Sequence, residues 1–300
     1  MLTDIVIQHL VTDQKVRIKC KELVKKVSIY KDKLAVQLTD KILIYAEDKN
    51  DLKYKIHKKI AKKIDCSLLV IVSHHIILCQ NDKLALMNFS GDIEREWVFE
   101  SPVRYMKPFG GAPKKEGLLV GLKNGDALEL FIDNAFPIPL VKQGVSIRIL
   151  DLSLNKRKLA VVDDNSNLTV YDLVTKETIF QELNVMSVAW NTEMDDLLAY
   201  SGAGLLSIKM GNFPPMTQKM NGFIVGFRGS KLFFLHQYVM MTMDMPQTSN
   251  LVKYIEKKDF RSAYKVACLG STEQDFKALG IEALQNGDFE IASKVIFLLY

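Results

Sequence analysis

The sequence contains no run of 18 or more consecutive uncharged apolar residues, so it predicts no membrane-spanning helix. Residues 1–4 lack the basic and then apolar layout of a signal peptide, and we expect a cytoplasmic protein. Cysteine is also scarce, and the four residues are Cys20, Cys66, Cys79 and Cys268. None of them forms a C-x-x-C pair, which argues against a zinc knuckle or a thioredoxin-like site and is typical of a reducing compartment.

The sequence also lacks the motifs of common enzyme classes, namely G-x-S-x-G, the Walker sequence and H-E-x-x-H. Asp163 and Asp164 are candidates for paired carboxylates, but they lie in an expected turn, where Asp is favoured for bonding to the backbone. His74 and His75 are neighbours on an expected strand and point to opposite faces, so they do not readily serve one metal ion. We therefore expect no catalysis, no cofactor, no metal and no small-molecule substrate.

What the sequence does contain is one unit that recurs six times. Each copy has an apolar run, a short turn and a second run of alternating character, as in KLAVVDDNSNLTVYDL at 158–173. The first strong apolar residues of the copies are spaced by 42, 42, 41, 38 and 35 residues, and they are Leu34, Ile76, Leu118, Leu159, Leu197 and Leu232. A hairpin cannot bury its own apolar face, so hairpins at this period predict four-stranded sheets packed side by side.

Further strand-like segments flank these hairpins. An apolar segment precedes each one, at 27–30, 67–72, 103–106, 146–150, 185–190 and 223–227. A more polar segment follows most of them, at 53–58, 93–100, 136–141 and 178–183. Two more segments, 4–11 and 15–23, predict a partial blade plus the outer strand of the first unit. This pattern predicts a WD-repeat-like β-propeller of six or seven blades over residues 1–246.

One copy carries traces of the WD signature. Tyr171 and Asp172 stand where WD-repeat proteins have their signature dipeptide, and Trp190 lies on an expected inner strand. Most other copies end differently, in IYA, MNF, LFI and IKM. The repeat is therefore degenerate, and the propeller prediction rests on the period and the strand pattern.

The alternation stops near residue 246, and apolar residues then recur at helical intervals, which predicts α-helical hairpins over 247–300. The expected caps and stops are Asn250, Asp259, Gly270, a capping box of Ser271 with Gln274, Asn286, Gly287 and Asp288. The motif D-F-x-x-A-x-K-V occurs at 259–266 and 288–295, with Ala permitting close helix packing and Phe filling the groove. We interpret this as the start of an α-solenoid. The chain ends inside an apolar helix, so we expect a fragment or an end that packs on something else.

The net charge of +5 is unevenly distributed. Residues 1–63 hold 16 Lys and Arg against 8 Asp and Glu, and the densest segment is KYKIHKKIAKK at 53–63. Its candidate interaction residues are Lys53, Lys55, Lys58, Lys59, Lys62 and Lys63. Such a patch suits an acidic protein, a phospholipid surface or nucleic acid, or else it is a solvated outer strand whose lysines discourage aggregation. Few aromatic residues lie near it, so we expect no nucleic-acid partner.

Several strings carry a more specific resemblance: QKVRIKCKELVKKVSIY at 14–30, KEGLLVGLKNG at 115–125, RKLAVVDDN at 157–165, SVAWNTE at 187–193 and AYKVACLGSTEQDFKALGIEAL at 263–284. They resemble the WD-repeat subunits of the intraflagellar transport A complex, at the second propeller and the start of the helical solenoid. The resemblance implies a longer protein, with an earlier propeller before this region and a long solenoid after it.

The resemblance implies a non-catalytic scaffold that supports retrograde transport along the ciliary axoneme and delivery of membrane proteins to cilia. The implied partners are the other transport A subunits and ciliary membrane-protein cargo adaptors, and the implied locations are the cytoplasm, the cilium, the axoneme and the basal body. The alternative, which comes from the residues themselves, is a membrane-coat-like propeller that binds acidic lipid surfaces through the basic segment 53–63.

Overall fold

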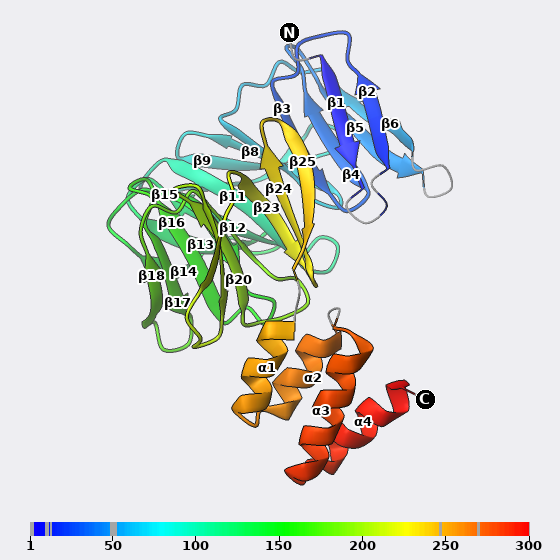
Figure 1. The fold of residues 1–300 in the computed structure, drawn as a ribbon. Coiled ribbons are helices and arrows are strands. Elements are labelled where there is room, and N and C mark those ends of the chain that lie inside the picture. The colour runs from blue at the N-terminus through cyan, green and yellow to red at the C-terminus, as the bar shows by residue number, and fades with distance from the viewer. Residues whose placement is uncertain are drawn as a thin grey trace. The chain divides into compact units, whose positions relative to one another are not determined.

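The computed structural model describes residues 3–9, 12, 14–48, 53–245, 248–268 and 271–299. Within these residues, six antiparallel sheets of three or four strands follow one another along the chain, and four short helices come last (Figure 1). In each sheet the spatial order of the strands is their order in the chain. The predicted fold class, a β-propeller followed by a short helical segment, is confirmed, and the propeller has six blades.

The first sheet consists of β3 (Lys26–Tyr30), β4 (Lys33–Gln37), β5 (Ile42–Asp48) and β6 (Lys53–Ile60). The second sheet consists of β7 (Leu68–Ile71), β8 (His75–Gln80), β9 (Lys83–Asn88) and β10 (Ile93–Val98). The third sheet consists of β11 (Val103–Gly110), β12 (Gly117–Leu122), β13 (Asp126–Phe131) and β14 (Ile138–Lys142). The fourth sheet consists of β15 (Ile147–Leu152), β16 (Lys158–Asp163), β17 (Leu168–Asp172) and β18 (Thr178–Glu182). The fifth sheet consists of β19 (Ser187–Trp190), β20 (Leu197–Gly202), β21 (Leu205–Met210) and β22 (Met216–Lys219). The sixth sheet consists of β23 (Phe223–Arg228), β24 (Lys231–His236) and β25 (Val239–Asp244).

The two N-terminal strands form a sheet of their own. β1 (Asp4–Gln8) pairs with β2 (Lys15–Lys19), and their apolar side chains pack on the first four-stranded sheet. The prediction that one of them is the outer strand of the first unit is wrong, because β6 pairs with β5 and occupies that edge. Residues 10–11 of the predicted first strand lie outside the described residues.

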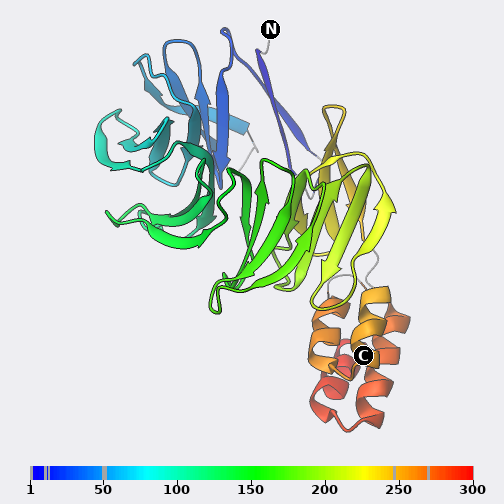
Figure 2. The same cartoon turned by 90° about the vertical axis from the view of Figure 1, so that its left-hand side faces the viewer.

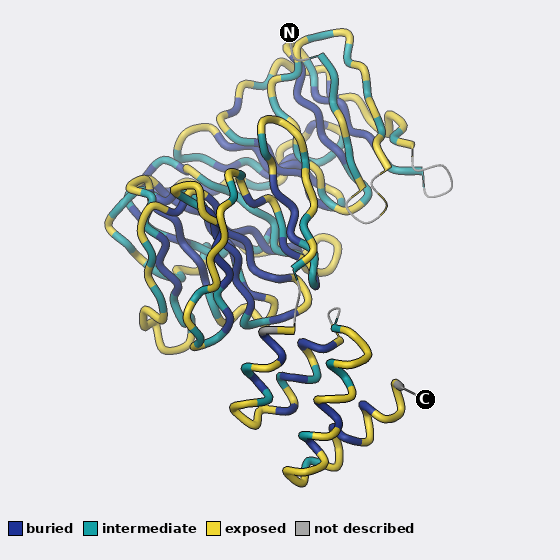
Figure 3. The backbone as a smooth tube through the Cα atoms, viewed as in Figure 1, coloured by how far each residue is buried: buried dark blue, intermediate teal, exposed yellow. Residues whose placement is uncertain are grey.

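The inner strands send alternate side chains to two different neighbours. All six residues of β12 are buried. Leu118, Val120 and Leu122 join a hydrophobic cluster with residues of the second sheet, whereas Leu119 joins a cluster with Ile147 of the fourth sheet. A strand covered on both faces has no polar side, which explains the continuous apolar runs in the sequence. Figure 3 shows such strands in dark blue between exposed edges and turns.

The polar segments predicted after the hairpins are edge strands, namely β6, β10, β14 and β18. The sequence pattern missed β22, the edge strand of the fifth sheet. This strand has four residues, all exposed, and it follows Pro214 and Pro215. So short a segment has no apolar face that would reveal it as a strand.

The chain divides into two compact units, one of residues 1–152 with 159–183 and the other of residues 153–158 with 184–300. The second unit contains the fifth and sixth sheets and the helices α1 (Thr248–Glu256), α2 (Phe260–Cys268), α3 (Glu273–Gln285) and α4 (Phe289–Leu299). One hydrophobic cluster joins these sheets and helices, and Figure 2 shows the helices, in orange and red, grouped together. The division at residue 246 into a propeller domain and a helical domain stays a prediction.

The helix starts match the predictions in part. Asp259 caps α2 by accepting the backbone N–H of Ser262 at 3.1 Å, and Asp288 caps α4 in the same way. Asn250 is not a cap, because it is a buried residue within α1. The capping box lies one residue later than predicted, with Thr272 as N-cap and Asp275 as its partner. Ser271 with Gln274 and Thr272 with Asp275 both have the residue types of a capping box, so the sequence pattern does not tell which of them begins the helix.

The helix ends and the repeated motif also match in part. Asn286 and Gly287 end α3 as predicted, and Gly270 lies outside the described residues. In both copies of the motif the Ala and Val side chains are buried. The Phe positions differ, since Phe260 is 4% exposed and Phe289 is 69% exposed. The prediction that Phe fills a groove is therefore correct for the first copy and wrong for the second.

The close approach of β20 to the segment before β19 yields a testable prediction about Gly202. A Cβ atom at Gly202 would lie 1.7 Å from the backbone oxygen of Asn184, so we expect Gly202→Ala to lower the free energy of unfolding by about 2–3 kcal/mol. Gly226→Ala is the matched control, because its Cβ would meet only Phe233 Cδ2, at 3.9 Å. Urea denaturation followed by circular dichroism measures both, and equal effects would contradict the clash.

Candidate functional site

The residues of the WD signature occupy structural positions. Asp172 ends β17, and its Oδ1 accepts the backbone N–H groups of Val174 at 2.7 Å and Thr175 at 3.2 Å. Tyr171 is half-buried beside it, in the first compact unit. Trp190 is buried at the end of β19, in the second unit. Asp172 thus organises the turn into β18, and the assignment of the three residues as a repeat signature stays a prediction.

The adjacent acids Asp163 and Asp164 lie at the turn between β16 and β17. Asp163 Oδ1 accepts the backbone N–H of Asn167 at 2.8 Å, as expected of a turn residue. The nearby Ser146 side chain, together with the Arg104 guanidinium at 3.5 Å, lowers the pKa of the Asp164 carboxyl. The two carboxylates therefore have separate structural partners.

The six lysines of the basic segment do not share one face. In an antiparallel pair, directly opposite residues lie on the same face of the sheet. Lys53, Lys55 and Lys58 stand opposite alternate residues of β5, so they share one face, and Lys59 lies on the other. A register shift between Lys58 and Ile56 leaves His57 as an extra residue, and this bulge brings Lys55 and Lys58 to the same side.

Some of these lysines already have contacts. Lys55 forms an ion pair with Asp48 at 2.7 Å, and Lys62 donates to the backbone oxygen of Gly91 at 2.8 Å. Lys62 and Lys63 follow the strand and line a cavity of about 540 Å³ against β9 and β10. The structure therefore resolves the predicted patch into a three-lysine face of β6, a separate Lys59, and a pair beside the second sheet.

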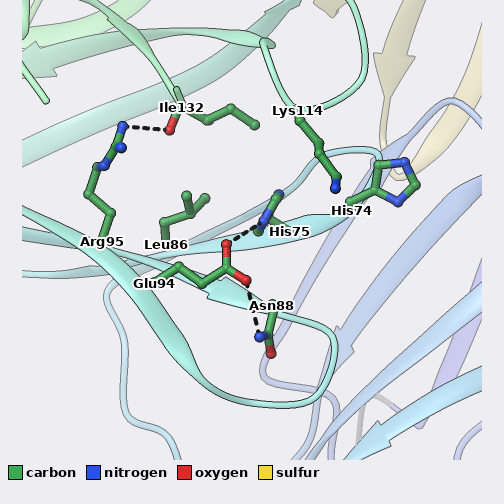
Figure 4. A pocket seen from close by; sticks show the side chains of 8 residues that line it. All are labelled: His74, His75, Leu86, Asn88, Glu94, Arg95, Lys114 and Ile132. Carbon is green, nitrogen blue, oxygen red and sulfur yellow. Dashed lines mark hydrogen bonds and ion pairs between the residues drawn. The ribbon is translucent and has the colours of Figure 1, made fainter. Parts of the chain in front are cut away.

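A pocket of about 520 Å³ lies between the second and third sheets, and its residues were not predicted as a site. It is lined by His74, His75, Leu86, Asn88, Glu94, Arg95, Lys114 and Ile132 (Figure 4). The second sheet and its turns supply six of these side chains, and the connections of the third sheet supply Lys114 and Ile132. These lining residues lie too far apart in the sequence to form one motif. They come together because neighbouring sheets of the repeat pack side by side.

Hydrogen bonds fix the polar wall of this pocket. His75, which is 7% exposed, bonds through Nε2 to Glu94 Oε2 at 2.9 Å. Asn88 Nδ2 donates to Glu94 Oε1 at 3.1 Å, and the two contacts, with that of Asn88 the larger, lower the pKa of the Glu94 carboxyl. Arg95 donates to the backbone oxygen of Ile132 at 3.0 Å. The expectation that His74 and His75 lie on one strand and point to opposite faces is wrong, because β8 begins at His75, His74 lies exposed in the turn before it, and both line this pocket.

The helical segment docks on the fifth sheet through an aromatic contact. Phe213, in the loop between β21 and β22, meets the Tyr254 ring edge-on at a centroid distance of 5.5 Å. Lys257 Nζ lies 3.9 Å from the centroid of the Phe213 ring, which adds a cation–π contact. Lys209 donates to the backbone oxygens of Gly211 and Phe213 and so holds the loop in place.

The remaining candidate chemistry is limited. Within the described ranges, no three His, Cys, Asp or Glu side chains gather so as to hold a metal ion. Cys66 and Cys79 are buried free thiols, and burial raises the pKa of both. No helix in the described part of the chain is both long enough and apolar enough to cross a membrane.

The sheets, their period and their contact surfaces define a WD-repeat-like β-propeller. Residues 1–240 match the family model described as IFT122 second beta-propeller, and the chain belongs to this family. It is 53% identical over 296 residues to the Intraflagellar transport protein 122 homolog of Xenopus tropicalis and 52% identical to that of Homo sapiens. These matches cover 98% of the chain and 25% and 24% of the two relatives. The chain thus spans about a quarter of their length.

The docked Tyr254 yields a prediction about alkaline pH. Burial, with the carboxylates of Asp196 and Asp259 nearby, raises the pKa of Tyr254 to about 12. Between the usual tyrosine pKa near 10 and this value, only the unfolded chain ionises the group, so its contribution to stability is lost as pH rises. We expect Tyr254→Phe to remove one phenol from the late phase of a phenolate absorbance titration and to reduce the alkaline loss of stability.

Tyr238→Phe is the control for this titration, because it also removes one phenol and because Tyr238 is 98% exposed. The late phase should persist in this variant. A late phase of unchanged amplitude in Tyr254→Phe would show that Tyr254 does not titrate as described.

Proposed function

We propose that the chain is the second-propeller region of a non-catalytic scaffold subunit of the intraflagellar transport A complex. In this role it supports retrograde ciliary transport and the delivery of membrane proteins to cilia through protein–protein contacts. Its partners are the other subunits of the complex and ciliary membrane-protein cargo adaptors. It acts in the cytoplasm, at the basal body and along the axoneme, without a cofactor or a small-molecule substrate.

The observation that carries this proposal is the match to the IFT122 second-propeller family over residues 1–240. The relatives named as intraflagellar transport protein 122 homologues match almost the whole chain, including the helical segment. A rigid propeller with helices docked to its last sheets suits a scaffold, because packed sheets present large surfaces that hold their shape. The polar contacts described above, such as those of Asp163, Asp172 and Arg95, hold turns and sheets in place, and a scaffold also needs surfaces with a fixed shape.

The test uses a tagged full-length subunit that contains this region, expressed in ciliated cells. We expect the other transport A subunits to co-purify with it at near-stoichiometric amounts. A second full-length version carries Gly202→Ala, which should weaken the fold locally and reduce recovery of the complex, with Gly226→Ala as its control. Purification of the unmodified subunit without any other transport A subunit would contradict the proposal.

A second candidate function rests on the exposed face of β6. Lys53, Lys55 and Lys58 lie side by side on this face, and Ile56, on the opposite face, is 60% exposed. Lysines near an anionic bilayer each contribute about 1 kcal/mol of attraction. The basic segment 53–63 therefore suits a membrane-coat-like contact with acidic lipid, in place of or beside a protein partner.

Vesicle flotation separates the two candidates. If the lipid contact exists, vesicles containing phosphatidylserine should carry the protein upward at low salt, and the variant Lys53→Glu, Lys55→Glu, Lys58→Glu should bind at least about tenfold less. A matched variant makes the same charge change at other exposed lysines, namely Lys15, Lys19 and Lys21. Equal losses of vesicle binding in both variants would show that only the net charge matters. No flotation at all would contradict this candidate function.

A further inference from the structure

We propose that the pocket between the second and third sheets binds an acidic side chain from an extended segment of a partner protein. The inference rests on the proposed scaffold function, since it names one surface through which such a scaffold would act and the chemistry of the segment it would hold. The charges at the pocket, the contacts that hold its loops and its size all favour such a ligand.

The charges favour an anion. Glu94 is the carboxylate that lines the pocket, and its two oxygens are already occupied by Asn88 and His75. Lys114 and His74 also line it, and both are exposed. Within the described residues, neither makes a hydrogen bond or an ion pair, although Lys114 lies close enough to Glu94 to help lower the pKa of its carboxyl. The lining therefore carries two cations, Lys114 and Arg95, against one carboxylate that is already engaged.

Lys114 and His74 both line the pocket drawn in Figure 4, although they come from connections of different sheets. A buried carboxylate accounts for this placement. Glu116 is fully buried, and its Oε1 accepts the backbone N–H of Ser73 at 3.2 Å. Glu116 follows Lys114 by two residues and Ser73 precedes His74, so this bond ties the two loops together.

Close backbone contacts shape the loop that carries Lys114. Gly111 has a φ of +131°, and a Cβ atom there would lie 2.6 Å from the backbone oxygen of Lys115. The backbone N–H of Lys115 bonds to the oxygen of Ala112 at 2.9 Å, which closes a turn. A ligand that meets a backbone shaped in this way loses less free energy to ordering the loop than one that must assemble it.

The size and the walls of the pocket favour a peptide side chain. A volume of about 520 Å³ lies within the range of small-ligand pockets and accommodates one or two side chains. Leu86 and Ile132, at 4% and 3% exposure, form apolar walls. The methylene groups of a Glu side chain can contact these walls while its carboxylate accepts charge-assisted hydrogen bonds from Lys114 and His74. A phosphate group has no apolar part that would use them.

The first experiment titrates the 300-residue chain with the peptide acetyl-Gly-Glu-Glu-Gly-amide and follows the His75 ring signals by NMR. We expect a saturable shift with this probe and none with acetyl-Gly-Gln-Gln-Gly-amide. The double variant Lys114→Gln, His74→Gln should raise the Kd at least about tenfold, because both charge-assisted donors are removed. Both residues are exposed, and unchanged signals elsewhere would verify that the variant is folded.

Lys115→Gln is the matched control, since it removes the same charge from the same loop but from a residue that does not line the pocket. The pocket inference is wrong if the acidic peptide produces no saturable shift, or if Lys115→Gln weakens binding as much as the double variant. It is also wrong if inorganic phosphate or phosphatidylserine vesicles displace the peptide at equal concentration of anionic groups, because the ligand would then be a phosphate rather than a protein segment.

The second experiment separates this inference from the proposed function. The full-length subunit with Lys114→Gln and His74→Gln is purified from ciliated cells beside the unmodified subunit. Failure of the peptide titration while the unmodified subunit still recovers the transport A subunits overturns the pocket alone. Saturable peptide binding by a subunit that recovers none of them supports the pocket and overturns the proposed function alone.

Discussion

The structure depends on one constraint, which is that each inner strand has two apolar faces and its own sheet covers neither. β8 illustrates this, since Ile77 and Cys79 belong to the cluster shared with the third sheet, whereas Ile76 and Leu78 belong to the cluster shared with the first. Burial of apolar surface is the main favourable term in folding, so a sheet with such strands is stable only between two others. The repeat of the hairpin therefore follows from the chemistry of its inner strands.

Polar contacts join successive sheets at intervals that match the repeat. Ser28 accepts the backbone N–H of Ile71, a residue 43 positions later, and Glu116 accepts that of Ser73 across the same separation. Lys107 and Asp151 form an ion pair 44 positions apart. In the second unit, Lys158 bonds to Asp196 and Asn191 bonds to Gly229, both across 38 positions.

These separations follow the spacings of the hairpins, which shorten along the chain from 42 to 35 residues. Contacts one repeat apart join equivalent places of neighbouring sheets. The apolar clusters hold the sheets together, and because hydrogen bonds and ion pairs are directional, these contacts fix the register between sheets.

The sequence was sufficient for the parts of the fold that apolar periodicity controls. The six hairpins, the apolar strand before each one and most of the polar edge strands were predictable, because burial on two faces, or on one, leaves a pattern in the residues themselves. β22 has no such pattern, and the exposure of Phe289 depends on which helix stands beside it. The position of β1 and β2 was predicted wrongly, because no local sequence pattern shows which strands pair with each other.

The candidate sites show the same division between local and long-range information. The basic segment was visible as a run of lysines, but a single bulge at His57 decides which of them share a face. That bulge cannot be read from an alternation of charged residues, because every position there is polar or exposed. The pocket at Lys114 and His74 was not visible at all, since its parts lie one repeat apart and neither part is unusual alone.

A repeat fold places binding chemistry in the junctions between its copies. The inner strands of all sheets must remain apolar, so they cannot vary much in character without exposing the core. The junctions need polar contacts that fix the register, and these contacts include bonds of a serine, a buried glutamate, a lysine–aspartate pair and an asparagine at different places. Each junction is therefore free to differ in the residues around these bonds. Where one bond is that of a buried carboxylate and the residues around it include cations, as between the second and third sheets, a structural contact also prepares a surface for an acidic partner.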